Sequence, residues 1–329
     1  MKVTHDGRQM KVEVTSDGAG LVSHAGSALL AQVADKSGLT RALSSELGSL
    51  QLREGSHDRG RVVRDLAVML ADGGDCLADM AVVRDQAVLF GRAASDSTAF
   101  RVIDQIANDP DAIDWLRAAH ARARARVWQL AGAPDRLTID LDATLLAAHS
   151  DKEGAEPTWK RGYGFHPMLA YGDQTGEALA GELRPGNAGA GTAADQIAVA
   201  EQAIAQIPAE HIESIELLLR VDSVGACHEL LDWCREARIG YSVGFDVTEP
   251  VRAAIAKIAD QDWVCSLDQG GEERPNGQVC EITQQLDLQG WPTGSRVLVR
   301  ARRGPHPQRQ RHRPAQSAVS RLRAQPRLA

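Results

Sequence analysis

The stretch LTIDLDATLL, residues 137–146, decides the fold of the second half of the chain. Its first part alternates apolar and polar residues, which is the period-two pattern of a half-buried β-strand. Asp140 and Asp142 are two positions apart, so on a strand both carboxylates point to the same face. Two like charges held side by side are costly unless a cation lies between them. The pattern therefore indicates a magnesium site, because one or two carboxylates and substrate phosphate oxygens commonly hold this ion.

Length and composition bound the class of protein. The chain has 329 residues, 43% of them hydrophobic, which is enough for two domains or one large domain with additions. No apolar run reaches the roughly 18 residues that a membrane helix needs, and the first residues contain no apolar signal segment. The five cysteines form no CxxC pair, which favours free thiols over a disulfide framework or a zinc site. We therefore expect a soluble, cytoplasmic protein without membrane partners.

The charge is unevenly distributed along the chain. The formal net charge is −7, and residues 301–329 contain eight arginines and no acidic residue, so the remainder carries about −15. Such an acidic body argues against non-specific coating of DNA, which needs a basic surface. An acidic, metal-binding site flanked by local basic contacts is compatible with this distribution.

Residues 1–133 are predicted to form a helical N-terminal domain with a possible role in DNA binding. Apolar residues recur at helical spacing, Gly38 predicts a turn between two helices, and Ser95 predicts a helix N-cap. Three arginines spaced by two on the last predicted helix do not form one face, and we expect them to be solvated: Arg122, Arg124 and Arg126.

Residues 134–262 change to strands that alternate with helices. Three strands in succession, followed by alternating helix and strand, predict an α/β sandwich with a mixed sheet. Short strands are predicted beyond this core, in residues 263–300. The predicted core strands cover residues 137–149, 164–173, 177–186, 215–223 and 239–247, and the helices cover residues 192–207, 226–238 and 249–259.

A further acidic residue, Asp222, ends the apolar run of LLLRVDSVGA, residues 217–226. Ligands of α/β sheets collect outside the carboxyl ends of the strands. We therefore expect Asp142 and Asp222 to meet at one metal ion. The alternative is that Asp222 caps the helix that begins near Ala226.

The motif DLDAT resembles the DxDxT nucleophile motif of haloacid-dehalogenase-type phosphatases. That resemblance implies that Asp140 attacks phosphorus and Asp142 acts as the acid. The family also needs a downstream lysine and a late GDxxxD-type motif, whereas Gly172–Asp173 comes early and lacks the second acid. Three strands before the first helix also differ from the order of that fold. This is a remote alternative.

A second resemblance covers far more of the chain. It is carried by HDRGRVVRDLAVMLADGGDCLADM, LTIDLDATL, KRGYGFHPMLAYGD, GELRPGNAGAGTAADQ and LLLRVDSVGACHELLDWC. From Ser16 to about Arg300, the chain resembles the DDE transposases of bacterial insertion sequences, in the branch named for insertion sequence 1380. The resemblance implies an RNase H-like core, interrupted by a β-rich insertion that begins at residues 263–300.

The same resemblance implies a function and its cofactors. It implies two-metal strand cleavage and transfer, with Mg²⁺ or Mn²⁺, on double-stranded DNA with terminal inverted repeats. The intact family enzyme is expected to be a homodimer or larger. The first two acids of the family, catalytic and metal-binding, map to Asp142 and Asp222.

The turn that contains Trp159, Lys160 and Arg161 lies between the first two predicted strands, near the mouth of this site. An aromatic residue beside basic ones can stack on an unpaired base and neutralise phosphates, so we predict a DNA contact. The alternative is an ordinary exposed loop with the tryptophan packed inward.

The third acid of the family, a glutamate on a helix after the β-rich insertion, has no counterpart that we can identify. Glu272, Glu273 and Glu281 lie in the predicted β-rich segment and receive no role. Residues 301–329 are expected to be a basic tail, either disordered or read out of frame after a frameshift. We therefore expect an incomplete transposase that is inactive alone. The alternative is a catalytically dead DNA-binding derivative that inhibits the intact enzyme.

Overall fold

The computed structural model describes residues 24–50, 57–148, 151–189, 192–222, 227–268, 270–302, 314–315 and 318–320. The chain divides into two compact units. One consists of Met1–Ala133 with Gln206–Glu210, and the other of Pro134–Ala205 with His211–Ala329. Among the described residues, no helix has the length and apolar character needed to cross a bilayer.

The described elements of the first unit are all helices. Gly38 has a left-handed backbone (φ +84°) between the first two helices, and the Ser95 hydroxyl accepts a hydrogen bond from the Thr98 amide. The helices of this unit are α1 (Ser27–Lys36), α2 (Leu39–Glu46), η1 (Leu47–Leu50), α3 (Arg59–Ala71), η2 (Leu77–Met80), α4 (Ala81–Arg84), α5 (Ala87–Phe90), α6 (Asp96–Ala107) and α7 (Ala112–Ala131).

The arginines of α7 correct one prediction. Arg124 is only 3% exposed, and its Nη1 donates to the Gln206 carbonyl over 3.0 Å. It shares a helix stripe with the buried Trp128 four residues later, so it lies on the inner face. Arg122 pairs with Glu46, and Arg126 donates to a backbone carbonyl. Arg122 and Arg126 are exposed, as predicted, and the prediction was wrong for Arg124.

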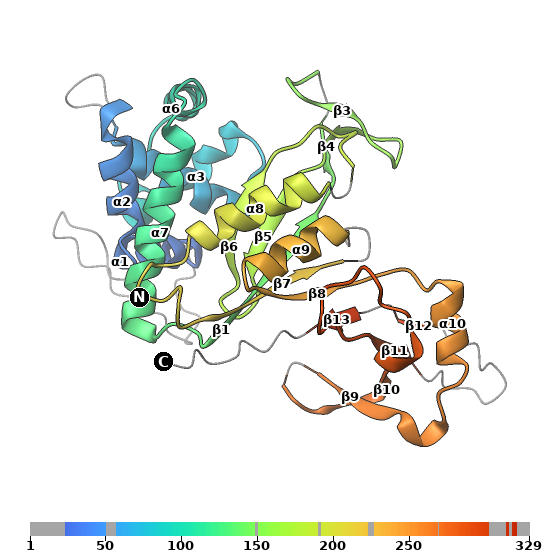
Figure 1. The fold of residues 1–329 in the computed structure, drawn as a ribbon. Coiled ribbons are helices and arrows are strands. Elements are labelled where there is room, and N and C mark those ends of the chain that lie inside the picture. Colours follow the sequence, from blue (N-terminus) through green and yellow to red (C-terminus); the bar gives the residue numbers. More distant parts are fainter. Residues whose placement is uncertain are drawn as a thin grey trace. The chain divides into compact units, whose positions relative to one another are not determined.

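The second unit is built on a mixed, six-stranded sheet with β1 near its centre (Figure 1). The strand order is β13-β8-β7-β1-β5-β6. β7 runs parallel to β1 and β8 parallel to β7, whereas β1, β5 and β6 are successive antiparallel neighbours. The strands are β1 (Arg136–Ala143), β5 (Met168–Gly172), β6 (Glu177–Glu182), β7 (Glu216–Val221), β8 (Gly240–Val243) and β13 (Ala318–Ser320).

The apolar residues of β1 explain its central place. Leu137, Ile139 and Leu141 share one face of the strand, and each is at most 3% exposed. Helix α8 (Ala193–Ala205) packs against β1, β5 and β6, and α9 (His228–Glu236) packs against α8 and β8. The predicted α/β architecture with a mixed sheet is therefore confirmed.

Two smaller sheets accompany the main one. The first has the order β2-β4-β3 and interrupts the chain between β1 and β5; its strands are β2 (Leu146–Ala147), β3 (Glu156–Pro157) and β4 (Tyr163–Phe165). The single strand predicted over residues 137–149 therefore ends at Ala143. The second has the order β12-β11-β10-β9, with β9 (Val264–Leu267), β10 (Glu273–Glu281), β11 (Leu298–Arg302) and β12 (Pro314–Ala315). Helices α10 (Glu249–Ile255), η3 (Asp260–Asp262) and η4 (Thr283–Gln285) complete this unit.

Three short pieces of the basic tail take part in sheets: residues 301–302 end β11, and β12 and β13 form the other two. β12 pairs with β11, and β13 pairs with β8, in both cases antiparallel. The rest of the predicted tail, residues 303–313, 316–317 and 321–329, lies outside the described residues.

Candidate functional site

Strand register brings the two predicted acids to neighbouring positions. Leu141 of β1 pairs with Val221, the last residue of the parallel strand β7; Asp142 follows Leu141 on β1, and Asp222 directly follows the end of β7. Leu141 and Val221 are 3% and 6% exposed, whereas both aspartates are exposed. Both aspartates therefore stand at the carboxyl edge of the sheet, where ligands of α/β sheets collect.

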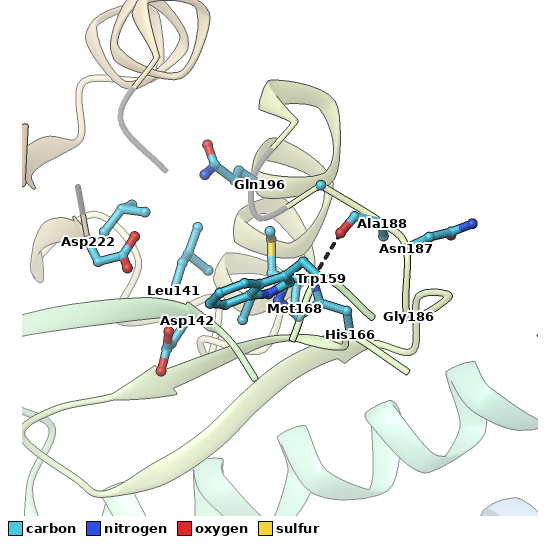
Figure 2. Close-up of a pocket in the computed structure, with 13 residues that line it drawn as sticks. Leu141, Asp142, Trp159, His166, Met168, Gly186, Asn187, Ala188, Gln196 and Asp222 are labelled. Atoms are coloured by element: carbon cyan, nitrogen blue, oxygen red, sulfur yellow. Dashed lines mark hydrogen bonds between the residues drawn. The ribbon is translucent and has the colours of Figure 1, made fainter. Parts of the chain in front are cut away.

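A pocket of about 510 Å³ opens at this edge, and both aspartates line it. Figure 2 shows the labelled Asp142 and Asp222 at one end of the pocket and Asn187 at the other. The lining residues come from the ends of β1 and β7, from the turn between β3 and β4, from the start of β5 and the segment before it, from α8 and from the loop after β6. They are Leu141, Asp142, Ala143, Trp159, His166, Met168, Gly186, Asn187, Ala188, Gly189, Gln196, Val221 and Asp222.

Asp222 is not the N-cap residue of the next helix. α9 begins at His228, and Cys227 takes the N-cap position without a side-chain hydrogen bond. Ala226, near which this helix was predicted to begin, lies outside the described residues.

Asp140, on the same face of β1, has a different environment. Its register partner on β7 is Arg220, whose Nε and Nη2 donate to the two oxygens of the Asp140 carboxylate. Arg220 Nη2 also donates to Asp173 over 3.1 Å. The hydrogen bonds to Asp140, with the charges of both acids, raise the pKa of Arg220 above its ordinary value. The cation beside Asp140 is therefore a guanidinium group of the protein itself.

This pairing argues against the phosphatase alternative. A nucleophilic Asp140 would need an oxygen free to approach phosphorus, but both of its oxygens accept hydrogen bonds from Arg220. Asp140 also does not line the pocket that holds Asp142.

One wall of the pocket is a loop, residues 185–189, fixed by buried polar groups. His166 is 3% exposed, and its Nδ1 donates to the Ala188 carbonyl over 2.9 Å (Figure 2). Because a carbonyl only accepts, this contact requires the proton on Nδ1. Arg184, 4% exposed, donates to the His166 and Gly189 carbonyls and to Asp195. These contacts hold the loop against the segment before β5.

The bond from Arg184 also acts on its acidic partner. Arg184 Nη1 lies 2.7 Å from the Asp195 carboxylate, and this hydrogen bond lowers the pKa of Asp195. The carboxylate is therefore charged under ordinary conditions and tied to the loop.

Two pocket residues were missed in the sequence. Gln196 of α8 is 1% exposed, and the Cys227 thiol donates to its Oε1 over 3.7 Å. His166 is likewise buried, and it also lines the pocket. Both residues stand in motifs that carry the family resemblance, but neither motif indicates which side chains reach the pocket.

The predicted DNA-contact turn lies partly at the pocket. Trp159 is 71% exposed and lines the pocket, so the alternative of an inward-packed tryptophan was wrong. Lys160 Nζ lies 4.9 Å from the centroid of the Trp159 ring, within the range of a cation–π contact. Lys160 and Arg161 do not line the pocket, and Arg161 has a positive φ of 63° in the turn.

No glutamate is found among the described residues that line the pocket. Glu281 accepts hydrogen bonds from Arg296 and Thr283, which lower its pKa, and it lies on β10. Glu272 and Glu273 are exposed at the start of that strand. The structure thus brings two acids together in the pocket and adds none of the late glutamates.

Another group of possible metal ligands, Asp75, Cys76 and Asp79, lies in the helical unit. The Asp79 carboxylate accepts hydrogen bonds from the backbone amides of Asp75 and Cys76, and these bonds lower its pKa. This arrangement is a capping box at the start of η2. We therefore assign it a structural role.

Comparison with known proteins adds one match. The family described as transposase DDE domain group 1 matches residues 4–322. The matched range includes both pocket aspartates and most of the basic tail. No curated protein matches the chain.

Proposed function

The chain belongs to the transposase DDE domain group 1 family, and on this basis we propose that it is an insertion-sequence transposase acting by phosphoryl transfer at terminal inverted repeats. We also propose an RNase H-like core and the branch named for insertion sequence 1380. The strand order β8-β7-β1-β5-β6, with β7 parallel to β1 and β8 parallel to β7, supports the core assignment.

The observation that carries this proposal is the placement of Asp142 and Asp222. They follow a register pair on neighbouring parallel strands, both are exposed, and both line one pocket. Hard carboxylate oxygens at one edge suit Mg²⁺ or Mn²⁺, so these two residues would hold the ion. When bound, such ions stabilise the charge on the attacking and leaving oxygens of an in-line displacement at phosphorus.

The residues around the aspartates have separate roles in this proposal. Trp159 offers an exposed ring at the pocket on which an unpaired base can stack. Lys160 and Arg161, in the same turn, neutralise phosphates of the DNA backbone. The loop held by His166 forms the wall opposite the aspartates and limits the space for the substrate.

We further propose that this polypeptide alone binds the ends of its element but does not join them. The support is that the described lining of the pocket contains two acids, whereas the family uses three. Misplacing a reacting group by about 1 Å can cost roughly a hundredfold in rate.

The presence of only two acids in the described pocket lining also supports the second candidate function, a DNA-binding derivative that inhibits the intact enzyme. Intact enzyme is proposed to act as a homodimer or larger assembly. The out-of-frame origin of the tail stays a prediction.

A combined binding and joining assay tests these proposals. The purified chain would be mixed with duplexes carrying the repeats that flank its own coding sequence, with Mg²⁺ or Mn²⁺. We expect specific binding without strand joining, and inhibition when an intact relative is added. Joining by the chain alone would overturn the proposed inactivity. Equal affinity for the repeats and for scrambled DNA would overturn the transposase assignment.

A further inference from the structure

Helix α8 carries a polar side chain within its buried, otherwise apolar stripe. That side chain is Gln196, which is 1% exposed. The other buried residues of the helix are Ala193, Val199, Ala200 and Ala203. A buried carboxamide costs free energy unless its donors and its acceptor are satisfied, and an apolar side chain would pack equally well on this stripe. The place of Gln196 therefore requires a reason other than packing.

The Gln196 carboxamide is held at its oxygen. Oε1 accepts a hydrogen bond from the Cys227 thiol over 3.7 Å. In the part of the chain that the structure describes, no hydrogen bond is found for Nε2. Gln196 lines the pocket, and Figure 2 shows its carboxamide extending from α8 on the side where Leu141 and Asp222 lie. The two N–H groups of Nε2 are thus available to a ligand in the pocket.

The lining beyond the two aspartates suits an uncharged, flat group. Leu141, Met168 and Val221 contribute apolar atoms and are each at most 6% exposed. None of the described lining residues is a lysine or an arginine, the residues that most often hold DNA phosphates. The volume of about 510 Å³ leaves room for one nucleobase. Enzymes that take a base into a pocket recognise it by hydrogen bonds to its edge and by stacking.

The surroundings of Nε2 are fixed without a ligand. His166 and Arg184 hold the loop at residues 185–189 through its backbone carbonyls and through their own contact. Gln196 itself lies on a helix that packs against β1, β5 and β6. A preformed site loses little freedom on binding, so one donor at a fixed position can select among bases by where their acceptor atoms lie.

We propose that the pocket takes one unpaired nucleobase of the substrate DNA and that Gln196 recognises it. Nε2 donates to an acceptor atom on the edge of the base, and the Cys227 thiol keeps the carboxamide turned so that Nε2 faces the ligand. Gln196 is therefore a specificity-determining residue, and Cys227 is a positioning residue. This inference rests on the proposed function, which supplies the DNA.

The test is a scan of terminal-repeat duplexes in which one nucleotide at a time, near the end of the repeat, lacks its base. Affinities of the full chain are measured in Mg²⁺ by fluorescence anisotropy. For the wild type we expect a loss of about fivefold to tenfold at one position. Gln196→Met, of similar volume, should bind intact DNA more weakly by about the same factor and lose nothing further when that base is absent.

The matched control is Gln174→Met. Gln174 lies in the same unit, and its Oε1 accepts a hydrogen bond from the Thr138 amide over 2.6 Å, but it is not among the described residues that line the pocket. This variant should keep the wild-type affinity and the wild-type scan. Cys227→Ala releases Oε1 of Gln196, so we expect a smaller loss of about twofold to threefold, coupled to the same base. It keeps the test decisive if Gln196→Met does not fold.

Two results would overturn the role of Gln196. One is a scan of Gln196→Met, or of Cys227→Ala, in which the loss at every position equals that of the wild type. The other is coupling of Gln196 to an uncharged methylphosphonate in place of a phosphate, and not to a missing base, because Nε2 would then hold the backbone. A different result would sink the proposed function itself: wild-type affinity that is no higher for the terminal repeats than for scrambled DNA.

Discussion

Strand β1 carries an aspartate in the middle of its pairing with β7 and another at the carboxyl end, and the two aspartates have different environments. In the middle, Asp140 lies opposite Arg220, which donates to both of its oxygens. Two residues later, Asp142 is exposed at a pocket, and the neighbouring strand continues into a second aspartate, Asp222. The difference teaches that spacing sets the face of a carboxylate, whereas the residue on the adjacent strand sets what it can bind.

Substitutions at Leu141 and Asp142 give the largest expected effect, because these neighbours on β1 differ in burial. Leu141→Ala removes a buried side chain, 3% exposed, from the opposite face of the strand. We expect the free energy of unfolding to fall by about 2–4 kcal/mol, measured by urea denaturation. Asp142→Asn, at an exposed position, should change it by no more than about 0.5 kcal/mol. A cost at Asp142 as large as that at Leu141 would show that this acid is a structural group.

Trp159 tests whether the pocket end of the sheet is a surface for DNA. Trp159→Ala should weaken binding of DNA with unpaired bases by about 1–3 kcal/mol, since stacking on one aromatic ring contributes this much. Fluorescence anisotropy with labelled oligonucleotides measures the change. Trp159→Phe keeps a ring and should retain most of the affinity. Unchanged binding by the alanine variant would remove Trp159 from the interface.

Asp195 offers a second carboxylate held by an arginine, and its pH dependence can be compared with the exposed acids. Arg184 lowers the pKa of Asp195, so the carboxylate adds stability above the ordinary aspartate pKa of about 3.9. This stability is lost as pH falls through the lower, folded-state value. We expect Asp195→Asn to cost about 1 kcal/mol at pH 7, and the difference from wild type to shrink below about pH 4. A difference that grows on acidification would contradict the assigned cause.

The smallest expected effect concerns the two basic residues of the Trp159 turn. Lys160→Ala combined with Arg161→Ala should lower the slope of log K against log salt concentration by about 1–2, because each cation releases about one counterion from DNA. The measurement is a salt titration of binding to the terminal repeats. An unchanged slope would place both side chains outside the interface.

The sequence predicts most of the sheet because its strands have clear periodicity and turns. The alternation in residues 137–141 and the apolar run ending at Val221 predict two strands whose carboxyl ends carry acids, and the structure places both acids at one pocket. Partners across strands could not be predicted in this way. The link between Asp140 and Arg220 depends on register, and register requires knowing that β7 lies beside β1.

Burial of polar residues was equally hard to anticipate. Arg124, spaced by two from other arginines, resembles a solvated residue until the helix stripe that it shares with Trp128 is known. His166 and Gln196 reach the pocket only because the loop after β6 and helix α8 fold beside the end of β1. Such contacts come from tertiary packing and leave no local pattern.

The most direct test of the account is a crystal structure of the chain grown with Mn²⁺, with anomalous differences measured to locate the ion. We predict a peak about 2.0–2.2 Å from carboxylate oxygens of both Asp142 and Asp222, the range expected for a small divalent cation, while Arg220 still binds Asp140. A peak at Asp140 or Asp173, or no peak near Asp142 and Asp222, would contradict it.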